Sequence, residues 1–333
     1  MNRVIPLAIY ASLLISGNAM AIEKEPLVGA CAPGTSLCAL LSPGGFYASG
    51  TGYYIQPSET GLGLFTDSWQ YSTPGGVYSR SKPFNPDYEW EWAVKLGYDL
   101  PNSANSIEVR YFRLDNHTHA INDTSDGPIS FGSAFFPDTS LEFEPGDTFV
   151  SDAHLTYKLD QADLVFGRSY AEVFKRYTFR PKVGVRYLDF EHRLTFAAPG
   201  YVISKFDGAG PLLGVDGRYA LTENFGLVGN FEYAAIVGEI DSRNFLTLGQ
   251  SVTYRSPKQD RVINNIVAKV GLDFAYPIGN GLLLAIEGGY EVGQYFNSSD
   301  IIQANFSTGP RIVSIETNHF SYQGPYATLT IHA

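Results

Sequence analysis

The sequence is poor in cysteine. Its 333 residues include only two, Cys31 and Cys38. Two cysteines cannot build the dense crosslinks of a small disulfide scaffold, and they argue against a metal or redox centre made of several thiolates. In an oxidising compartment this Cys-x6-Cys pair is expected to close a small loop. A crosslink between two chains is the alternative.

An excess of positive charge is also missing. Lys and Arg number 23 against 34 Asp and Glu, which gives a formal net charge of −11. Nucleic-acid binding requires a basic face that neutralises phosphates, so an acidic chain of this kind is a poor candidate for it. Charged residues of both signs make up only 17% of the chain, which leaves an unusually apolar and aromatic composition to explain.

Long apolar runs are absent beyond the first residues. Val4–Ser16 is almost wholly apolar, follows Arg3 and precedes a small-x-small pattern that ends at Ala21. This layout predicts a secretory signal peptide over residues 1–21. A membrane anchor is the rival reading, but a spanning helix needs roughly 20 apolar residues. A mature chain that lies in a membrane must therefore cross it as a closed barrel, since lipid satisfies no exposed backbone group.

What the sequence does contain is period-two alternation with many aromatics, including 22 Tyr and 22 Phe. The segment 88–99 is the clearest case, and such alternation is typical of a strand with two different faces. One face of it would carry Tyr88, Trp90, Trp92, Val94, Leu96 and Tyr98. The other would carry Glu89, Glu91, Ala93, Lys95, Gly97 and Asp99.

The same alternation returns along the chain, with both signs of charge and glycine opposite the aromatic residues. This arrangement predicts an all-β protein, a transmembrane antiparallel β-barrel of about ten strands with apolar side chains facing lipid. The expected strands cover residues 44–56, 88–99, 105–113, 148–170, 177–196, 208–221, 225–239, 262–276, 281–296 and 319–332. In the fourth strand the polar set changes parity, which predicts a β-bulge near residues 160–162.

The links between these strands alternate in length. Turn-rich links at residues 101–104, 222–224 and 277–280 are short, and longer stretches separate them. Outer-membrane barrels have short periplasmic turns and long extracellular loops. The predicted organisation is a signal peptide at 1–21, an N-terminal periplasmic segment with the cysteine pair at 22–43, and an outer-membrane β-barrel at 44–333.

Several short motifs resemble the Legionella major outer membrane protein-like pore-forming family. They are Cys31-Ala32-Pro33-Gly34-Thr35, Asp163-Leu164-Val165-Phe166-Gly167-Arg168, Arg180-Pro181-Lys182-Val183-Gly184-Val185-Arg186 and Gly208-Ala209-Gly210-Pro211. The resemblance covers most of the mature chain and implies an outer-membrane β-barrel with pore or structural activity and no catalytic residues. The chain departs from the usual barrel pattern at its end, because His332-Ala333 lacks a terminal aromatic residue.

The charged residues of the polar faces are the candidates for a pore lining. They are Glu89, Glu91, Lys95, Asp99, Glu108, Arg110, Lys158, Arg180, Lys182, Arg186, Asp216, Arg218, Glu232, Lys269, Asp273, Glu287 and Glu291. Charges in such positions set solute preference in channels. The alternative is a salt-bridged lumen that conducts nothing, because barrels of about eight strands are filled by side chains and open channels need about sixteen.

The expected function is a narrow porin-like pore for small solutes or ions in the Gram-negative outer membrane. The alternative is a non-conducting structural or adhesin-like barrel that acts through its external loops. Outer-membrane lipid and small solutes or ions are the expected partners, and a homo-oligomer is possible. The pair His117-x-His119 near Asp115 and Asp123 has residue types that bind metals, but two histidines in a loop are more often only polar loop residues. No enzyme motif stands out, so we expect no catalytic residues, no metal and no cofactor.

Overall fold

The computed structural model describes residues 37–39, 44–60, 67–73, 76–82, 85–123, 130–131, 141–142, 150–172, 176–196, 200–248, 250–279, 282–305 and 311–333. All of the regular elements within these ranges are β-strands. In this part of the chain no helix is long and apolar enough to cross a membrane.

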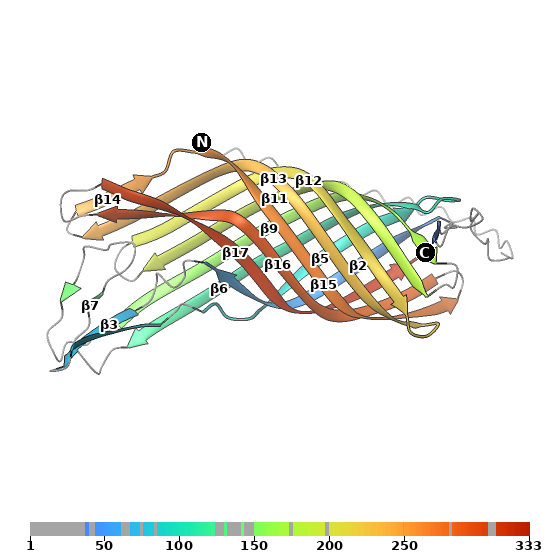
Figure 1. Ribbon diagram of the computed structural model, residues 1–333, viewed down its shortest axis with the longest axis horizontal. Helices are drawn as coiled ribbons and strands as arrows, with labels where there is room; N and C mark the ends of the chain where they lie inside the picture. Colours follow the sequence, from blue (N-terminus) through green and yellow to red (C-terminus); the bar gives the residue numbers. More distant parts are fainter. Residues whose placement is uncertain are drawn as a thin grey trace.

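Ten long antiparallel strands close into a barrel (Figure 1). They are β2 (Gly45–Glu59), β5 (Glu89–Asp99), β6 (Asn105–Asp123), β9 (Val150–Arg168), β11 (Tyr177–Phe196), β12 (Gly200–Ala220), β13 (Phe225–Leu248), β15 (Gln259–Gly279), β16 (Leu282–Asn305) and β17 (Arg311–His332). Each strand pairs with its neighbour in this order, and β17 closes the sheet on β2, with Tyr326 opposite Tyr53 and His332 opposite Tyr47. The predicted fold class is confirmed.

Seven short strands in the described part of the chain lie at the two ends of the barrel. They are β1 (Leu37–Ala39), β3 (Asp67–Thr73), β4 (Gly76–Lys82), β7 (Ser130–Phe131), β8 (Leu141–Glu142), β10 (Tyr170–Glu172) and β14 (Gln250–Arg255). In Figure 1, β3, β7 and β14 lie at the left end of the barrel, away from the C-terminus at the right end. β1 pairs with β10, which pairs in turn with the start of β11.

The short links are found where they were predicted, but the predicted strict alternation with long connections is wrong. The connection expected between the strands 177–196 and 208–221 is reduced to residues 197–199, because β12 begins at Gly200. Tight links join β5 to β6 and β12 to β13, where Leu100 donates to Asn105 and Leu221 donates to Phe225 through their backbones. The backbone of Ala333 donates to Phe46 at the same end. This end is called the turn end, and the opposite one, with β3, β7 and β14, the loop end. Several strands run further toward the loop end than predicted.

An apolar band encircles the outside of the barrel. On β11 it runs from Tyr177 through Val183 and Val185 to Tyr187, all 45–54% exposed. A strand rises about 3.3 Å per residue, and the strands of such a barrel are tilted by about 40° from its axis. These eleven positions therefore cover roughly 25 Å along the axis, which is the height of the apolar band of an outer-membrane barrel. Aromatic rings lie at both edges of the band. The band therefore has the dimensions of a bilayer core.

Beyond this band the two faces exchange polarity. On β11 the inward side chains Leu188, Phe190 and Leu194 are fully buried, while Glu191 and Arg193 on the outer face form an ion pair. The backbone alternation continues without a break, and only the chemistry of the two faces is exchanged. The reason is that water replaces lipid outside the barrel here, so the apolar residues turn inward as in a soluble protein.

Two predictions for β9 are wrong because of this exchange of polarity between the two faces. The pairing of β9 with β6 and with β11 runs in uninterrupted register through residues 160–162, so the predicted bulge is absent. Leu155, Tyr157 and Leu159 point inward and are buried. Lys158 therefore points outward, where half of its side chain is exposed beside Asp115, and it lines no lumen.

Close backbone contacts between β15 and β16 give a test of the packing. A Cβ atom at Gly289 would lie 2.1 Å from the carbonyl oxygen of Val270, whereas one at Gly50 would have nothing within 4 Å. We expect Gly289→Ala to destabilise the barrel by about 1–3 kcal/mol, because overpacking forces the backbone apart. Gly50→Ala is the control. Urea unfolding followed by the heat-modifiable mobility of the folded barrel measures both, and equal midpoints would contradict the register.

Candidate functional site in the barrel interior

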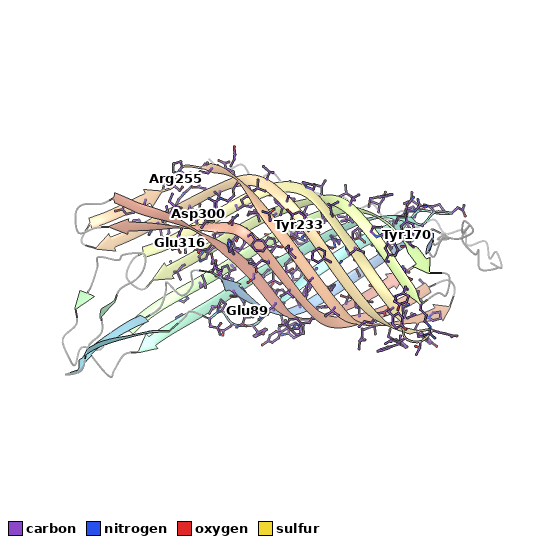
Figure 2. All side chains as sticks on the ribbon, viewed as in Figure 1. Glu89, Tyr170, Tyr233, Arg255, Asp300 and Glu316 are labelled. Atoms are coloured by element: carbon purple, nitrogen blue, oxygen red, sulfur yellow. The ribbon has the colours of Figure 1, made fainter. Side chains whose placement is uncertain are left out.

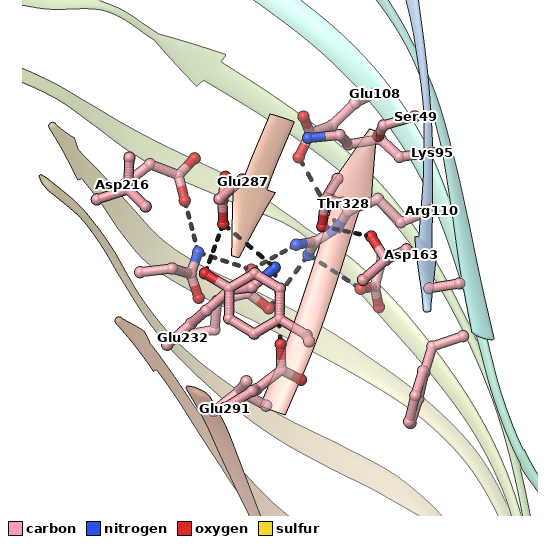
Figure 3. A pocket seen from close by; sticks show the side chains of 18 of the residues that line it. Ser49, Lys95, Glu108, Arg110, Asp163, Asp216, Glu232, Glu287, Glu291 and Thr328 are labelled. Atoms are coloured by element: carbon pink, nitrogen blue, oxygen red, sulfur yellow. Dashed lines mark hydrogen bonds and ion pairs between the residues drawn. The ribbon is translucent and has the colours of Figure 1, made fainter. Parts of the chain in front are cut away.

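A cavity of about 380 Å³ lies inside the barrel, on the turn-end side of its interior (Figure 3). Ser169, Thr178 and Arg218 line it, and they lie next to the turn-end limits of β9, β11 and β12. Most of the surrounding strands direct charged or hydroxyl side chains into it. We call this space the chamber.

Glu232 on β13 is the centre of the charge network in the chamber. Its carboxylate accepts hydrogen bonds from Arg110, one of them at 3.2 Å, and from Arg186 Nη2 at 2.5 Å. Lys182 Nζ lies 2.7 Å from the same carboxylate. Three cations from β6 and β11 thus surround one buried acid.

Asp163 on β9 completes this centre. Arg186 donates to it from Nε at 2.8 Å and from Nη2 at 3.0 Å. Arg110 Nη2 lies 2.9 Å from the same carboxylate. Each arginine therefore bridges Asp163 and Glu232, which makes a closed ring of four charges across the interior. Bidentate pairs of this kind fix geometry as well as charge.

A second group of charges lies nearer the turn end. Asp216 accepts a hydrogen bond from Lys182 at 2.7 Å and from Arg180 at 3.3 Å. Arg180 also donates to Glu108 at 3.1 Å, which accepts from the Tyr47 hydroxyl at 3.0 Å. Lys182 links this group to Glu232, so the network is continuous along the chamber.

A third group comes from β15, β16 and β17. Lys269 lies 3.7 Å from both Glu287 and Glu291 and 4.0 Å from the ring centroid of Tyr326. The Tyr326 hydroxyl donates to Glu287 at 2.7 Å, and the Tyr322 hydroxyl donates to Glu291 at 2.9 Å. Inward tyrosines thus cap the carboxylates that the cations leave partly unpaired.

Toward the loop end the interior becomes dry. Tyr157, Phe190 and Phe320 pack ring against ring, with centroids 4.8–6.4 Å apart, and none is more than 1% exposed. We call the buried hydrophobic cluster around them the apolar core. It consists of Tyr53, Ile55, Phe112, Leu114, Leu155, Tyr157, Leu159, Val165, Leu188, Phe190, Leu194, Val202, Phe206, Leu212, Ala234, Ile236, Ile240, Ile263, Tyr295, Ile301, Phe320, Tyr322 and Tyr326, with Ala93 packed against it.

The apolar core encloses the carboxylate of Glu59 and its polar partners. The Tyr157 hydroxyl donates to it at 2.8 Å, the Ser299 hydroxyl also donates to it, and His192 Nδ1 lies 3.4 Å away. All four side chains are buried. Every barrel strand except β5 contributes a residue to the apolar core, and Ala93 of β5 packs against it. The apolar core thus occupies the interior between the chamber and the loop end.

The structure brings most of the predicted lining residues to the chamber. Those that line it are Lys95, Glu108, Arg110, Arg180, Lys182, Arg186, Asp216, Arg218, Glu232, Lys269, Glu287 and Glu291. Asp273 accepts from Arg218 at 2.7 Å. Glu89 and Glu91 lie outside the chamber, in the half of β5 that is turned toward the loop end, and accept backbone hydrogen bonds from His117 and Asp115, respectively. Asp99 is the last residue of β5, at the turn end.

Sequence reasoning missed Asp163, Gln161 and the inward tyrosines. The sequence pattern suggested a change of parity in β9, which left the direction of Asp163 unassigned. In the structure Asp163 lies directly opposite Arg186 in the register of β9 and β11. The tyrosines were missed because aromatic residues were assigned to the lipid face. The predicted signal peptide and Cys31 lie outside the described residues. Cys38 lies in β1, opposite Ala171 of β10.

The closed sheet and its apolar band define an integral membrane β-barrel. A family model described as the Legionella pneumophila major outer membrane protein precursor matches residues 44–333. The chain belongs to this family of outer membrane proteins, as its motifs suggested. A search of curated proteins gives no match.

Solved structures with a similar course of the chain include the outer membrane protease OmpT from Escherichia coli. It is 12% identical, with a TM-score of 0.45, over 87% of this chain and 97% of that one. The toluene transporter TodX from Pseudomonas putida is 10% identical, with a TM-score of 0.30, over 87% and 90%. Because these sequence identities and TM-scores are low, the assignment to the family rests on the family model alone.

The central position of Glu232 can be tested by removing its charge. Glu232→Gln leaves Arg110, Lys182 and Arg186 with one carboxylate fewer, and breaking a buried ion pair from one side costs about 3–5 kcal/mol. Glu287→Gln is the matched control, because its ion-pair partner within the described part of the chain, Lys269, is 3.7 Å away. We expect a much larger drop in the urea midpoint for Glu232→Gln, and similar drops in both variants would show that the network has no such centre.

Proposed function

We propose that this protein forms a narrow pore for small ions or solutes, with the chamber as its turn-end vestibule and the apolar core as its gate. The observation that supports the proposal most is the density of charge inside the barrel. Burying an ion pair is no more stabilising than packing apolar side chains of similar volume. Ionisable groups inside a membrane-spanning segment are therefore expected to serve a function.

The arrangement of charge in the chamber suits small solutes of either sign. Carboxylates and cations alternate along its wall, as in the sequence Glu108, Arg180, Asp216, Lys182 and Glu232. A passing ion exchanges partners with these pairs and does not meet a surface of one sign. We infer weak charge selectivity and a low conductance, since ten strands leave little room for water beside such side chains.

A second candidate, a non-conducting barrel, is favoured by the apolar core. Phe190 and Phe320 are at most 1% exposed, so their rings are shielded from water and occupy interior space that a solute would have to cross. In this reading the chamber charges only specify the packing of the lumen, and the loop end carries the function.

We also propose that the protein is not an enzyme. Among the residues that the structure describes, Ser299, His192 and Glu59 are the set that most resembles catalytic machinery. They lie inside the apolar core, with both Ser299 and His192 fully buried. A nucleophile in such a position is out of reach of a substrate. Proteolysis of peptide libraries by the folded protein would overturn this inference.

Single-channel recording in planar bilayers distinguishes the two candidates. We expect small, infrequent conductance steps from the wild type and larger or more frequent ones from Phe320→Ala, because the truncation opens the dry layer. Phe231→Ala is the control, since its ring is 48% exposed on the outer face. Heat-modifiable mobility verifies that each variant is folded. If wild type and Phe320→Ala are both folded and silent at every voltage, the pore is rejected and the non-conducting barrel stands.

A further inference from the structure

Past the middle of the barrel, β16 leaves the wall. Its ladder with β15 ends at the pair Asn264 and Phe296, whereas its ladder with β17 continues to Asn305. In Figure 1 the two strands β16 and β17 bend away from β15 and run on toward the loop end. Here β16 also contacts β12, β13 and β14, none of which is its neighbour in the sheet.

The bend falls on an irregularity of the backbone. Asn297 has a φ of 61°, a left-handed conformation that asparagine adopts more readily than most residues. The register of β16 with β17 shifts between Tyr295 and Ser299. The backbone N–H of Asn297 donates to His319 Nδ1 of β17 at 2.9 Å. The bend is therefore a bulge that is held from one neighbouring strand only.

Beyond the bend both faces of β16 are covered. Five consecutive residues, which we call the strap, are at most 1% exposed, namely Ser298, Ser299, Asp300, Ile301 and Ile302. A strand in the wall of a barrel directs every second side chain outward, so the burial of all five shows that the strap lies inside. Figure 2 shows Asp300 in the loop-end half of the barrel.

Hydrogen bonds tie the strap to the far side of the interior. The backbone N–H of Asp300 donates to the Ser204 hydroxyl of β12 at 3.0 Å. Asn244 Nδ2 of β13 donates to the carbonyl oxygen of Ile302 at 3.0 Å. Both Ser204 and Asn244 are buried side chains that point into the barrel, so the strap reaches across the lumen to the opposite wall.

Other contacts hold the strap on the near side. The Ser299 hydroxyl donates to the Glu59 carboxylate of β2. The Asp300 carboxylate accepts from Arg261 Nη1 of β15 at 2.6 Å and from the Thr317 hydroxyl of β17 at 2.9 Å. Among the described strands only β17 pairs with the strap. Its ties to β2, β12, β13 and β15 all involve side chains, and they can break without unzipping a ladder.

The wall keeps a vacant edge beside the strap. Residues 259–263 of β15 pair with β13 on one side, and no described strand pairs with their other side. An unpaired edge readily takes up another strand, so a strap that leaves the interior has a place to go. Its departure would remove Ile301 from the apolar core.

We propose that the strap is the moving part of the gate. It closes the lumen in the arrangement described above. It opens the lumen by hinging at Asn297 toward the edge of β15, which breaks its contacts with β12 and β13 and takes Ile301 out of the apolar core. Two discrete placements of one segment are the kind of element on which switching proteins rely. The inference rests on the proposed pore, since only a conducting barrel has a gate.

The test removes the two hydrogen bonds to the far side, as Ser204→Ala with Asn244→Ala. Each such bond contributes roughly a factor of five to an equilibrium constant, so the released strap should become about tenfold more populated, or more. Release is measured on the full chain with Ser298→Cys, after Cys31→Ser and Cys38→Ser. A water-soluble maleimide reaches this buried thiol only when the strap leaves the interior, so labelling should accelerate by the same factor.

Two controls separate release of the strap from unfolding. Tyr233→Phe removes a hydrogen bond to Asn264 on the outer face and should leave the labelling rate unchanged. Ser106→Cys in β6, where the native side chain is 3% exposed, reports opening of the barrel as a whole. Faster labelling at Ser298→Cys alone supports the proposal. Equal rates with and without the two hydrogen bonds, or the same acceleration at Ser106→Cys, overturns it.

Conductance of the same double variant keeps this inference apart from the pore itself. More frequent or longer conductance steps from Ser204→Ala with Asn244→Ala support the strap as the gate. Unchanged steps together with faster labelling overturn the gate while the pore stands. Silence of the folded wild type and variant at every voltage rejects the pore, and with it any gate, whatever the labelling rate.

Discussion

Closure of the sheet between β17 and β2 is the constraint on which the rest of this structure depends. A membrane offers no partner to an exposed backbone group, so the first and last barrel strands must pair, as they do with Tyr326 opposite Tyr53. Once the sheet is closed, each residue of each strand points either into the barrel or away from it. All later questions about charge, packing and function are questions about what lies on these two faces.

The medium outside the barrel changes along each strand from lipid to water, and the side chains inside the barrel change with it. Between the aromatic edges of the apolar band the outer face must be apolar, and the polar side chains of the chamber gather inside. Nearer the loop end water surrounds the wall, and the interior becomes apolar. The same period-two alternation therefore produces the charged chamber where lipid surrounds the barrel and the apolar core where water surrounds it. The outward carboxylates of Asp160, Asp189 and Asp207, which lie opposite one another just past Tyr187, mark the transition on the outer surface.

This exchange of polarity decides which features could be predicted. The strands, their order and the short turns follow from period-two patterns, because a transmembrane segment repeats its outer apolar face clearly. The loop-end halves of the strands were underestimated, since there the pattern reverses and no lipid face marks it. Lys158 and Asp163 were misassigned for the same reason: both lie in β9, where apolar residues pass from the outer to the inner face while the backbone keeps its parity.

The sequence by itself determined that the chain is an integral membrane β-barrel with charge in its lumen, because strand length and alternation are local properties of consecutive residues. Only the tertiary structure decided which charges meet. Arg110 and Glu232 are 122 positions apart and pair across the interior, and Ser299 reaches Glu59 over 240 positions. Likewise, Lys205 and Asp241 become neighbours only through the register of β12 and β13. Such contacts depend on the stagger with which ten strands close, and no local pattern encodes it.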